Sequence, residues 1–306
     1  MTGCVALTGA TGFIGTHLRS AFLERDWQVR ALARRPPANE PRVDWVAGDL
    51  HDADAAARLV DGASLVVHCA GRVRGSSAAQ FNHTNAQGTG QLVRAAAAQR
   101  PWPRFLLMSS LAARQPDLSW YAASKRLAEE LMLRHADAMP WAALRPTAVY
   151  GPGDRELAPL FECMQRGVLP VLGPLRARIS LLHVQDLVEA VLCWAESARP
   201  VRGVFEIHDG SPEGYGWHEL MTLAEETWGR PVRRLPIPGA LLRGVGAANL
   251  ALAWLAGYDP MLTPGKVREL RHPDWRCDNG PFSAAVGWSP RVTLSAALRR
   301  NILVPA

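Results

Sequence analysis

The sequence has 306 residues, of which 48% are hydrophobic and 20% charged, a balance typical of a folded globular protein. The formal net charge is +6, but no basic run is interleaved with aromatic residues, so we expect no nucleic-acid partner. The first ten residues lead directly into a predicted strand, and the five cysteines are scattered without a CxxC pair. We therefore expect a cytoplasmic protein with no export signal, disulfide framework or metal site.

Short apolar runs alternate with helical patterns over the first 150 residues. Strands are predicted at Cys4–Thr8, Gln28–Ala33, Val43–Ala47, Leu65–His68, 105–109 and 141–145, and helices at about 12–25, 54–59, 85–99 and 121–134. This alternation predicts an α/β fold with a doubly wound parallel sheet, and apolar runs such as LVVH are typical of strands buried on both faces. We assign residues 1–150 to this domain.

Residues 151–306 differ in pattern, because helical stretches at about 156–166, 185–197, 217–228 and 238–256 are separated by glycine and proline. We expect a smaller, mainly helical substrate-binding lobe that packs tightly on the first domain. Its segment 244–257 contains no charged residue but is too short to span a bilayer, so no integral membrane segment is expected. The segment is predicted to be a buried or interface helix; a lid over an apolar substrate and a contact with a membrane surface stay open.

The turn after the first predicted strand carries glycines at positions 9, 12 and 15, a GxxGxxG pattern at a strand-to-helix junction. There, glycines allow a tight turn and the close approach of a pyrophosphate, while the helix N-terminus offers free N–H groups and a positive dipole end. The pattern predicts a Rossmann-type dinucleotide site formed by Gly9, Thr11, Gly12, Phe13, Ile14 and Gly15.

The end of the second predicted strand indicates the type of dinucleotide. An acidic residue there holds the ribose hydroxyls of NAD, whereas arginine accommodates the 2′-phosphate of NADP. This chain has Arg34 and Arg35 at that place and no acid. We therefore predict NADP(H) as the preferred cofactor. NAD(H) stays open, because both arginines could simply be solvated.

A candidate catalytic set follows the fifth predicted strand. Tyr121 and Lys125 are four residues apart on a predicted helix and so share one helix face, and Ser110 ends the strand before them. We expect the Lys125 ammonium to lower the pKa of the Tyr121 phenol and to bind the nicotinamide ribose. Ser110 would then bind the substrate oxygen while Tyr121 exchanges a proton with it. Lys125 and Lys266 are the only lysines among the 34 basic residues, so each position has a reason to differ from arginine.

Three segments, TGATGFIG (8–15), SSLAARQPDLSWYAASK (109–125) and LRPTAVYGPGD (144–154), resemble the extended short-chain dehydrogenase/reductase family, the broad NAD(P)-dependent epimerase/dehydratase group. The similarity covers nearly the whole chain. It implies that Asp49 and Leu50 border the adenine, that Ala70 and Gly71 line the cofactor, and that Pro146 and Thr147 lie near the nicotinamide. Of the two adjacent serines, Ser110 matches the family's catalytic position better than Ser109.

Three functions are compatible with these patterns. The first is an NADP(H)-dependent oxidoreductase that acts on a small-molecule ketone or secondary alcohol. The second is a nucleotide-sugar epimerase or related enzyme that uses a bound cofactor transiently; dehydration is disfavoured because Leu111 and Ala112 replace the acidic pair that dehydratases of this group carry after the catalytic residue. The third is a non-catalytic dinucleotide sensor, which would not need the serine, tyrosine and lysine together. A homodimer stays open.

Overall fold

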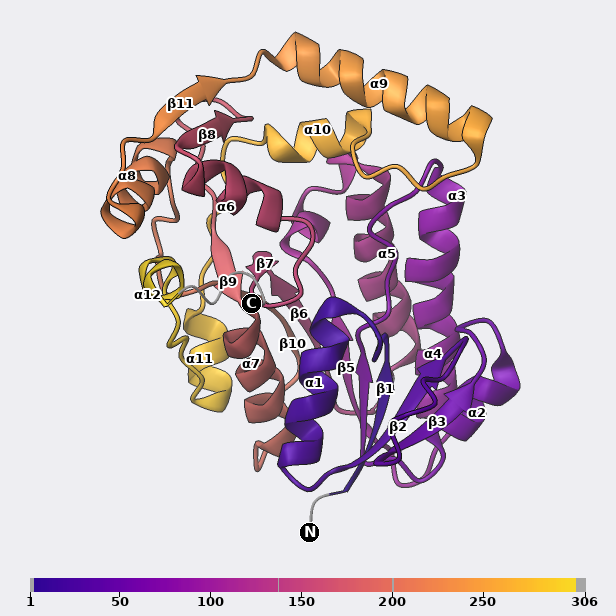
Figure 1. The fold of residues 1–306 in the computed structure, drawn as a ribbon. Coiled ribbons are helices and arrows are strands. Elements are labelled where there is room, and N and C mark those ends of the chain that lie inside the picture. The colour runs from indigo at the N-terminus through magenta and orange to yellow at the C-terminus, as the bar shows by residue number, and fades with distance from the viewer. Residues whose placement is uncertain (1–2, 137, 200, 301–306) are drawn as a thin grey trace.

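The computed structural model describes residues 3–136, 138–199 and 201–300. Its centre is a sheet of seven parallel strands in the order β10-β6-β5-β4-β1-β2-β3 (Figure 1). The strands are β1 (Cys4–Thr8), β2 (Gln28–Ala33), β3 (Val43–Ala47), β4 (Leu65–His68), β5 (Arg104–Met108), β6 (Trp141–Pro146) and β10 (Gly203–Ile207). The chain starts at β1 inside the sheet, runs outward to β3, and then crosses to β4 on the other side of β1. This order is that of a Rossmann-type doubly wound sheet, so the predicted fold class is confirmed.

Helices cover both faces of the sheet (Figure 1). One face carries α1 (Phe13–Glu24) and α7 (Val184–Glu196), and the other carries α2 (Ala53–Val60), α4 (Gly88–Ala97) and α5 (Trp120–His135). The central strand β4 explains why both layers are needed. Its residues Leu65 and Val67 belong to the first core, whereas Val66 between them belongs to the second. Successive strand residues point to opposite faces, so a strand between two helix layers buries apolar residues on both faces.

The first four strands lie where the sequence predicts them, and β5 and β6 differ from their predicted bounds by one residue. The strand β10 was not predicted, although it pairs with β6 at the edge of the main sheet. The helix α7 also returns to this layer, where Arg25 after α1 pairs with Glu189 and Glu196. The sheet layer thus includes segments that follow the division expected at residue 150, and we propose that the first unit extends to them.

Most of the remaining elements form the lobe above the sheet (Figure 1). Its helices are α6 (Ala158–Gln165), α8 (Trp217–Trp228), α9 (Gly239–Ala256), α10 (Pro264–Leu270) and α12 (Leu294–Arg299), whereas α11 (Gly280–Val286) lies beside β10 and packs into the core of the sheet layer through Phe282. Two small parallel sheets pair β7 (Ala148–Tyr150) with β9 (Leu181–His183), and β8 (Val168–Val171) with β11 (Arg233–Pro236). The helices α6, α8 and α9 were predicted, whereas α10, α11, α12 and the four short strands were not. Elements this short do not complete a recognisable hydrophobic period.

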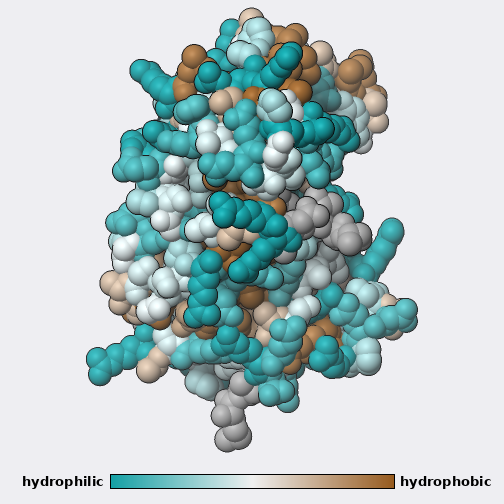
Figure 2. Space-filling view, turned by 60° about the vertical axis from the view of Figure 1, so that its left-hand side comes forward, coloured by the Kyte–Doolittle hydropathy of each residue, from teal (hydrophilic) through white to brown (hydrophobic). Residues whose placement is uncertain are grey.

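The helix α9 was predicted to be a buried or interface helix, and the structure excludes only the fully buried form. Only Leu242, Gly246, Leu250 and Ala253 are buried, and they face the rest of the protein from one side of the helix. The helix lies along the outer edge of the lobe (Figure 1), and apolar side chains gather at the same end of the molecule in the space-filling view (Figure 2). The length and composition of α9 alone would allow it to cross a membrane. In the structure, 22% of its residues are buried inside the protein.

Candidate active site

The turn between β1 and α1 is built from glycines that the backbone requires. Gly9 has a φ of +72°, and a Cβ there would lie 2.6 Å from the amide nitrogen of Ala70. A Cβ on Gly15 would lie 2.0 Å from the carbonyl oxygen of Gly9, whereas one on Gly12 would have that oxygen as its nearest neighbour at 3.3 Å. The turn is therefore tight on the protein side and open at the N-terminus of α1, which fits a diphosphate. The other predicted residues of the turn are exposed or half-buried: Thr11, Phe13 and Ile14.

A buried histidine holds the loop after β4 beside this turn. The Thr89 hydroxyl donates to the Asn85 carbonyl oxygen at 2.6 Å, so it accepts from Nε2 of His68 at 2.9 Å. Nδ1 of His68 then accepts from the Thr8 hydroxyl at 2.7 Å, and Thr8 accepts from the amide of Ala70 at 3.1 Å. Burial lowers the pKa of His68 to about 3, so this ring is neutral at physiological pH. The chain of hydrogen bonds positions Ala70, one of the residues expected to line the cofactor.

The residues expected at the adenosine end lie at the same edge of the sheet, because β2 and β3 run parallel to β1. Arg34 and Arg35 directly follow β2 and are exposed, and neither forms a hydrogen bond or ion pair with another described residue. Asp49 is exposed after β3 and accepts a backbone amide two residues further along at 2.7 Å. Leu50 is buried and packs against Gly88 at the start of α4.

Asn85 connects the loop after β4 to α5. Its Nδ2 donates to the Ser124 hydroxyl at 2.8 Å and to the carbonyl oxygen of Arg72 at 3.0 Å, and its Oδ1 accepts from the amide of Arg72 at 2.6 Å. Asn85 lies in a π-helical segment, η1 (Asn82–Gln87), which follows α3 (Ala78–Phe81) and precedes α4 where a single helix was predicted at 85–99. Such wider turns often occur at functional sites. Asn85 therefore fixes the loop beside Gly71.

The structure brings two of the predicted catalytic residues together. Ser110 begins the 3-10 turn η2 (Leu111–Arg114) after β5, and its hydroxyl accepts from the amide of Ala112 at 3.2 Å. Tyr121 is the second residue of α5, a helix whose N-terminus is capped by Ser119. The Ser110 side chain lies near enough to the Tyr121 phenol to lower its pKa, but burial raises it more, so the pKa of Tyr121 lies above its usual value.

Lys125 lies deeper than expected. Its ammonium donates to the carbonyl oxygen of Met108 at 2.8 Å, and a Cβ on Gly71 would lie 3.1 Å from its Nζ. Burial lowers the pKa of Lys125 to about 8. The sequence predicted that Lys125 would lower the pKa of Tyr121, but burial raises this pKa above its usual value. The side chains that partly offset the increase are Ser110 and Lys266. Lys125 shares a helix face with Tyr121 but extends toward the end of β5, so its charge lies away from the phenol.

Lys266 is the site residue that the sequence reasoning missed. It lies in α10, and its Nζ is 5.9 Å from the centre of the Tyr121 ring and 2.9 Å from Oε2 of Glu269. Glu269 is buried and also accepts a hydrogen bond from Ser119, the cap of α5. Of the two lysines of the chain, Lys266 approaches the phenol, whereas Lys125 extends to the Met108 carbonyl oxygen. Their scarcity was noticed in the sequence, but nothing there indicated that position 266 would fold back onto α5.

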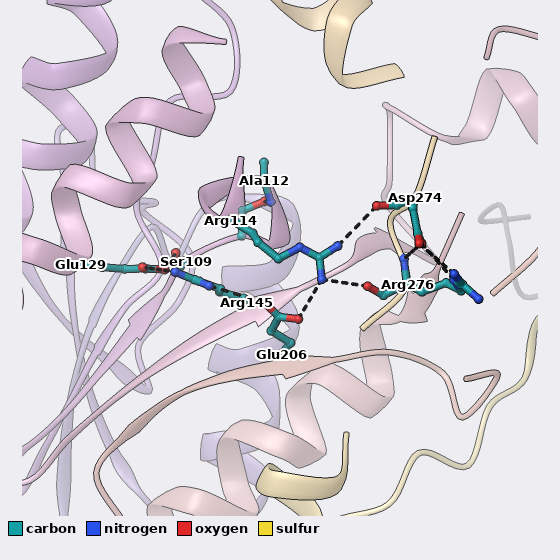
Figure 3. A network of polar contacts seen from close by, with 9 residues as sticks. Ser109, Ala112, Arg114, Glu129, Arg145, Glu206, Asp274 and Arg276 are labelled. Carbon is teal, nitrogen blue, oxygen red and sulfur yellow. Dashed lines mark hydrogen bonds and ion pairs between the residues drawn. The ribbon is translucent and has the colours of Figure 1, made fainter. Parts of the chain in front are cut away.

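Ser109 belongs to a buried polar network behind the site (Figure 3). Its hydroxyl donates to Oε1 of Glu129, and Arg145 holds both oxygens of Glu129 through contacts of 2.9 and 2.7 Å. Arg145 and Arg114 then meet on Glu206 of β10, at 3.4 and 3.2 Å. Arg114 also donates to two carbonyl oxygens of the segment before α11, those of Asp274 and Arg276. Because Ser109 is engaged in this network, Ser110 is the serine that faces Tyr121.

Pro146 and Thr147 lie at the end of β6 and are buried. The amide of Thr147 donates to the carbonyl oxygen of Ile207 at 3.2 Å, but its buried hydroxyl has no hydrogen-bond partner among the described residues. A buried hydroxyl without a partner is unusual and fits a place where a bound polar group would accept or donate the missing bond. In residues 3–136, 138–199 and 201–300, no three His, Cys, Asp or Glu side chains are arranged to hold a metal ion.

Comparison with known proteins shows the family and the fold. The model of the NAD dependent epimerase/dehydratase family matches residues 5–207. The chain is 40% identical to the ceramide reductase of Caulobacter vibrioides over 294 residues, which cover 93% of this chain and 89% of that protein. It is 28% identical to the 3 beta-hydroxysteroid dehydrogenase/Delta 5-->4-isomerase of Mycobacterium tuberculosis, covering 97% of this chain and 88% of that protein. Among solved structures, the chain is similar to the UDP-glucuronic acid 4-epimerase of Bacillus cereus in complex with UDP-glucuronic acid and NAD. The TM-score is 0.75 at 20% sequence identity, and the match covers 99% of this chain and 98% of that one. At this identity the similarity shows the fold alone.

Proposed function

Because the chain belongs to the NAD dependent epimerase/dehydratase family, we propose that it is an NADP(H)-dependent oxidoreductase that transfers a hydride between nicotinamide and a ketone or secondary alcohol. The observation that carries the proposal is the contact between Ser110 and Tyr121 at the carboxyl edge of the sheet, with Lys125 buried beside Gly71. Ligands of open α/β sheets bind at this edge.

Each side chain has a definite task in this proposal. The bound cofactor supplies or accepts the hydride. Ser110 donates a hydrogen bond to the substrate oxygen. Tyr121 has a raised pKa and is therefore a neutral phenol, so it can donate a proton to a carbonyl oxygen during reduction. Lys125 holds the ribose hydroxyls beside Gly71, and solvent returns a proton to Tyr121 after turnover.

The preference for NADP(H) rests on Arg34 and Arg35. Both guanidinium groups are exposed at the end of β2 and are not paired with described carboxylates, so they are available to a 2′-phosphate. The solved relative at 20% identity holds NAD, but a likeness of that degree concerns the fold alone. We propose NADP(H) as the preferred cofactor. The alternative is NAD(H), and direct measurement of the affinity for each cofactor would distinguish the two.

We propose an apolar lipid ketone as the substrate. Two of the relatives are named for a ceramide and for a steroid, and the residues around Tyr121 are suited to such a molecule. Trp120 is exposed beside Tyr121, Phe81 packs edge-on against the Tyr121 ring at 6.3 Å, and Val73 is exposed on the loop after Gly71. Apolar and aromatic walls with few polar groups are typical of sites for apolar ligands.

A nucleotide-sugar epimerase remains the second candidate, because the family and the fold include such enzymes. A non-catalytic dinucleotide sensor is the third, and it is disfavoured because a sensor needs the glycine turn but not Ser110, Tyr121 and Lys125 together.

The test follows cofactor consumption with a long-chain keto lipid, a ketosteroid and UDP-glucose. We expect the wild type to oxidise NADPH with a keto lipid or a ketosteroid. The Tyr121→Phe variant should lose this activity but keep its affinity for the cofactor. Epimerisation of UDP-glucose without net consumption of NADPH would instead establish the second candidate. Cofactor binding without turnover of any of the three compounds, together with full cellular function of Tyr121→Phe, would favour the sensor.

A further inference from the structure

The exposed face of α9 is unusual for a protein surface. Leu241, Val245, Leu252 and Leu255 are 56%, 47%, 57% and 86% exposed, and their spacing of four, seven and three residues places them in one stripe along the helix. Trp254 and Tyr258 extend the exposed apolar surface at its C-terminal end. Isolated apolar residues are common on surfaces, but a continuous stripe of this length indicates a binding surface.

The helix is held flat on the protein. Leu242, Gly246, Leu250 and Ala253 form the buried side, and a Cβ on Gly246 would lie 3.1 Å from the carbonyl carbon of Thr263 at the start of α10. Because this side is packed against the protein, only the outer face of α9 is available to a membrane. The geometry is therefore that of a helix that lies on a membrane surface.

Every charged residue within the segment 230–258, which contains β11 and α9, is positive, and the acid that follows it, Asp259, is paired with Arg72. Residues 230–258 contain four arginines and no aspartate or glutamate. Arg233 and Arg234 lie on β11, which leads directly into α9 (Figure 1), and Arg243 lies on α9 itself. All three are exposed, and none forms an ion pair with a described residue. Arginines beside an apolar helix face are complementary to anionic lipid headgroups.

We propose that α9 and β11 dock the protein on the surface of an anionic phospholipid bilayer. A second copy of the chain suits this surface less well, because a symmetric contact through α9 would bring the same arginines together, while the acid that follows α9, Asp259, is already paired with Arg72. An acidic protein partner would pair with the arginines but would leave the apolar stripe of α9 exposed.

The docking surface is directly connected to the candidate active site. The indole nitrogen of Trp254 donates to the carbonyl oxygen of Ser76 at 2.9 Å, and Arg72 pairs with Asp259 at 2.8 Å, so the end of α9 holds the loop that follows Gly71. A few residues further along the chain, α10 places Lys266 at Tyr121. A protein docked through α9 would thus present its active site close to the bilayer surface, where a lipid ketone resides.

The test is flotation of the full-length protein with vesicles, which needs no turnover and is therefore independent of the proposed reductase activity. Vesicles of phosphatidylcholine alone are compared with vesicles that also contain phosphatidylglycerol. We expect binding to the anionic vesicles that weakens as salt is added. We expect L252S/L255S and R233E/R234E each to weaken it by about tenfold or more. Matched controls are Leu133→Ser, which removes an exposed leucine from α5, and Arg42→Glu, which reverses an exposed arginine before β3; both should bind like the wild type.

Two results would overturn the proposal. One is that the wild type does not float with the anionic vesicles, or that the α9 variants and the controls bind equally. The other is that L252S/L255S converts a dimer into a monomer in light scattering while vesicle binding is unchanged, which would identify a second copy as the occupant of α9.

Discussion

Replacing Lys266 by methionine should raise the pKa of Tyr121. The ammonium lies 5.9 Å from the centre of the phenol ring and stabilises the phenolate. With an effective dielectric constant of about 20, a full charge at this distance contributes about 3 kcal/mol, equivalent to roughly two pH units. The Glu269 carboxylate, 2.9 Å from the ammonium, offsets part of this effect. We therefore expect the pKa of Tyr121 to rise by about one pH unit. At any pH below this pKa, the fraction of Tyr121 present as phenolate then falls about tenfold.

The phenolate can be titrated without any substrate, from its ultraviolet absorbance in a difference measurement against Tyr121→Phe. Burial raises the pKa of Tyr150 and Tyr215 far above the usual range, so these two tyrosines do not interfere. Lys266→Arg retains the positive charge and should leave the titration nearly unchanged. Glu269→Gln removes the offsetting carboxylate and should shift it in the opposite direction. An unchanged midpoint in Lys266→Met, or an equal shift in Lys266→Arg, would refute the electrostatic explanation.

Three further predictions concern the cofactor site and the network behind it. Gly15→Ala should lower dinucleotide affinity by about tenfold or more in a fluorescence titration, because its Cβ would meet the Gly9 carbonyl oxygen, whereas Gly244→Ala, which has no neighbour within 4 Å, should bind normally. Arg34→Ala should weaken NADPH much more than NADH, and equal losses would contradict the assignment of the 2′-phosphate. Glu129→Gln breaks a buried ion pair with Arg145 and should lower the free energy of unfolding in urea by about 3–5 kcal/mol. The adjacent Glu130→Gln breaks only an exposed pair with Arg126 and should cost less than about 1 kcal/mol; equal costs would contradict a special role for the network.

The sequence by itself determined the Rossmann-type sheet and the glycine turn, because both depend on local patterns. The apolar runs of β1 and β4 coincide with buried strands, and the glycines at 9 and 15 stand where a side chain would collide with the backbone. The adjacency of Tyr121 and Lys125 on one helix face was equally local. These features follow from periods of two or 3.6 residues and from the steric limits of the backbone, which act within a few residues.

Only the tertiary structure decided which groups act on those residues. Glu129 engages Ser109 and leaves Ser110 facing Tyr121, while Lys125 extends to the Met108 carbonyl and Lys266 approaches the phenol from α10. The edge strand β10 and the exposed position of α9 were likewise set by contacts between segments far apart in the chain. A pKa or a burial depends on the distance and solvation of such partners, and these quantities exist only once the chain has folded.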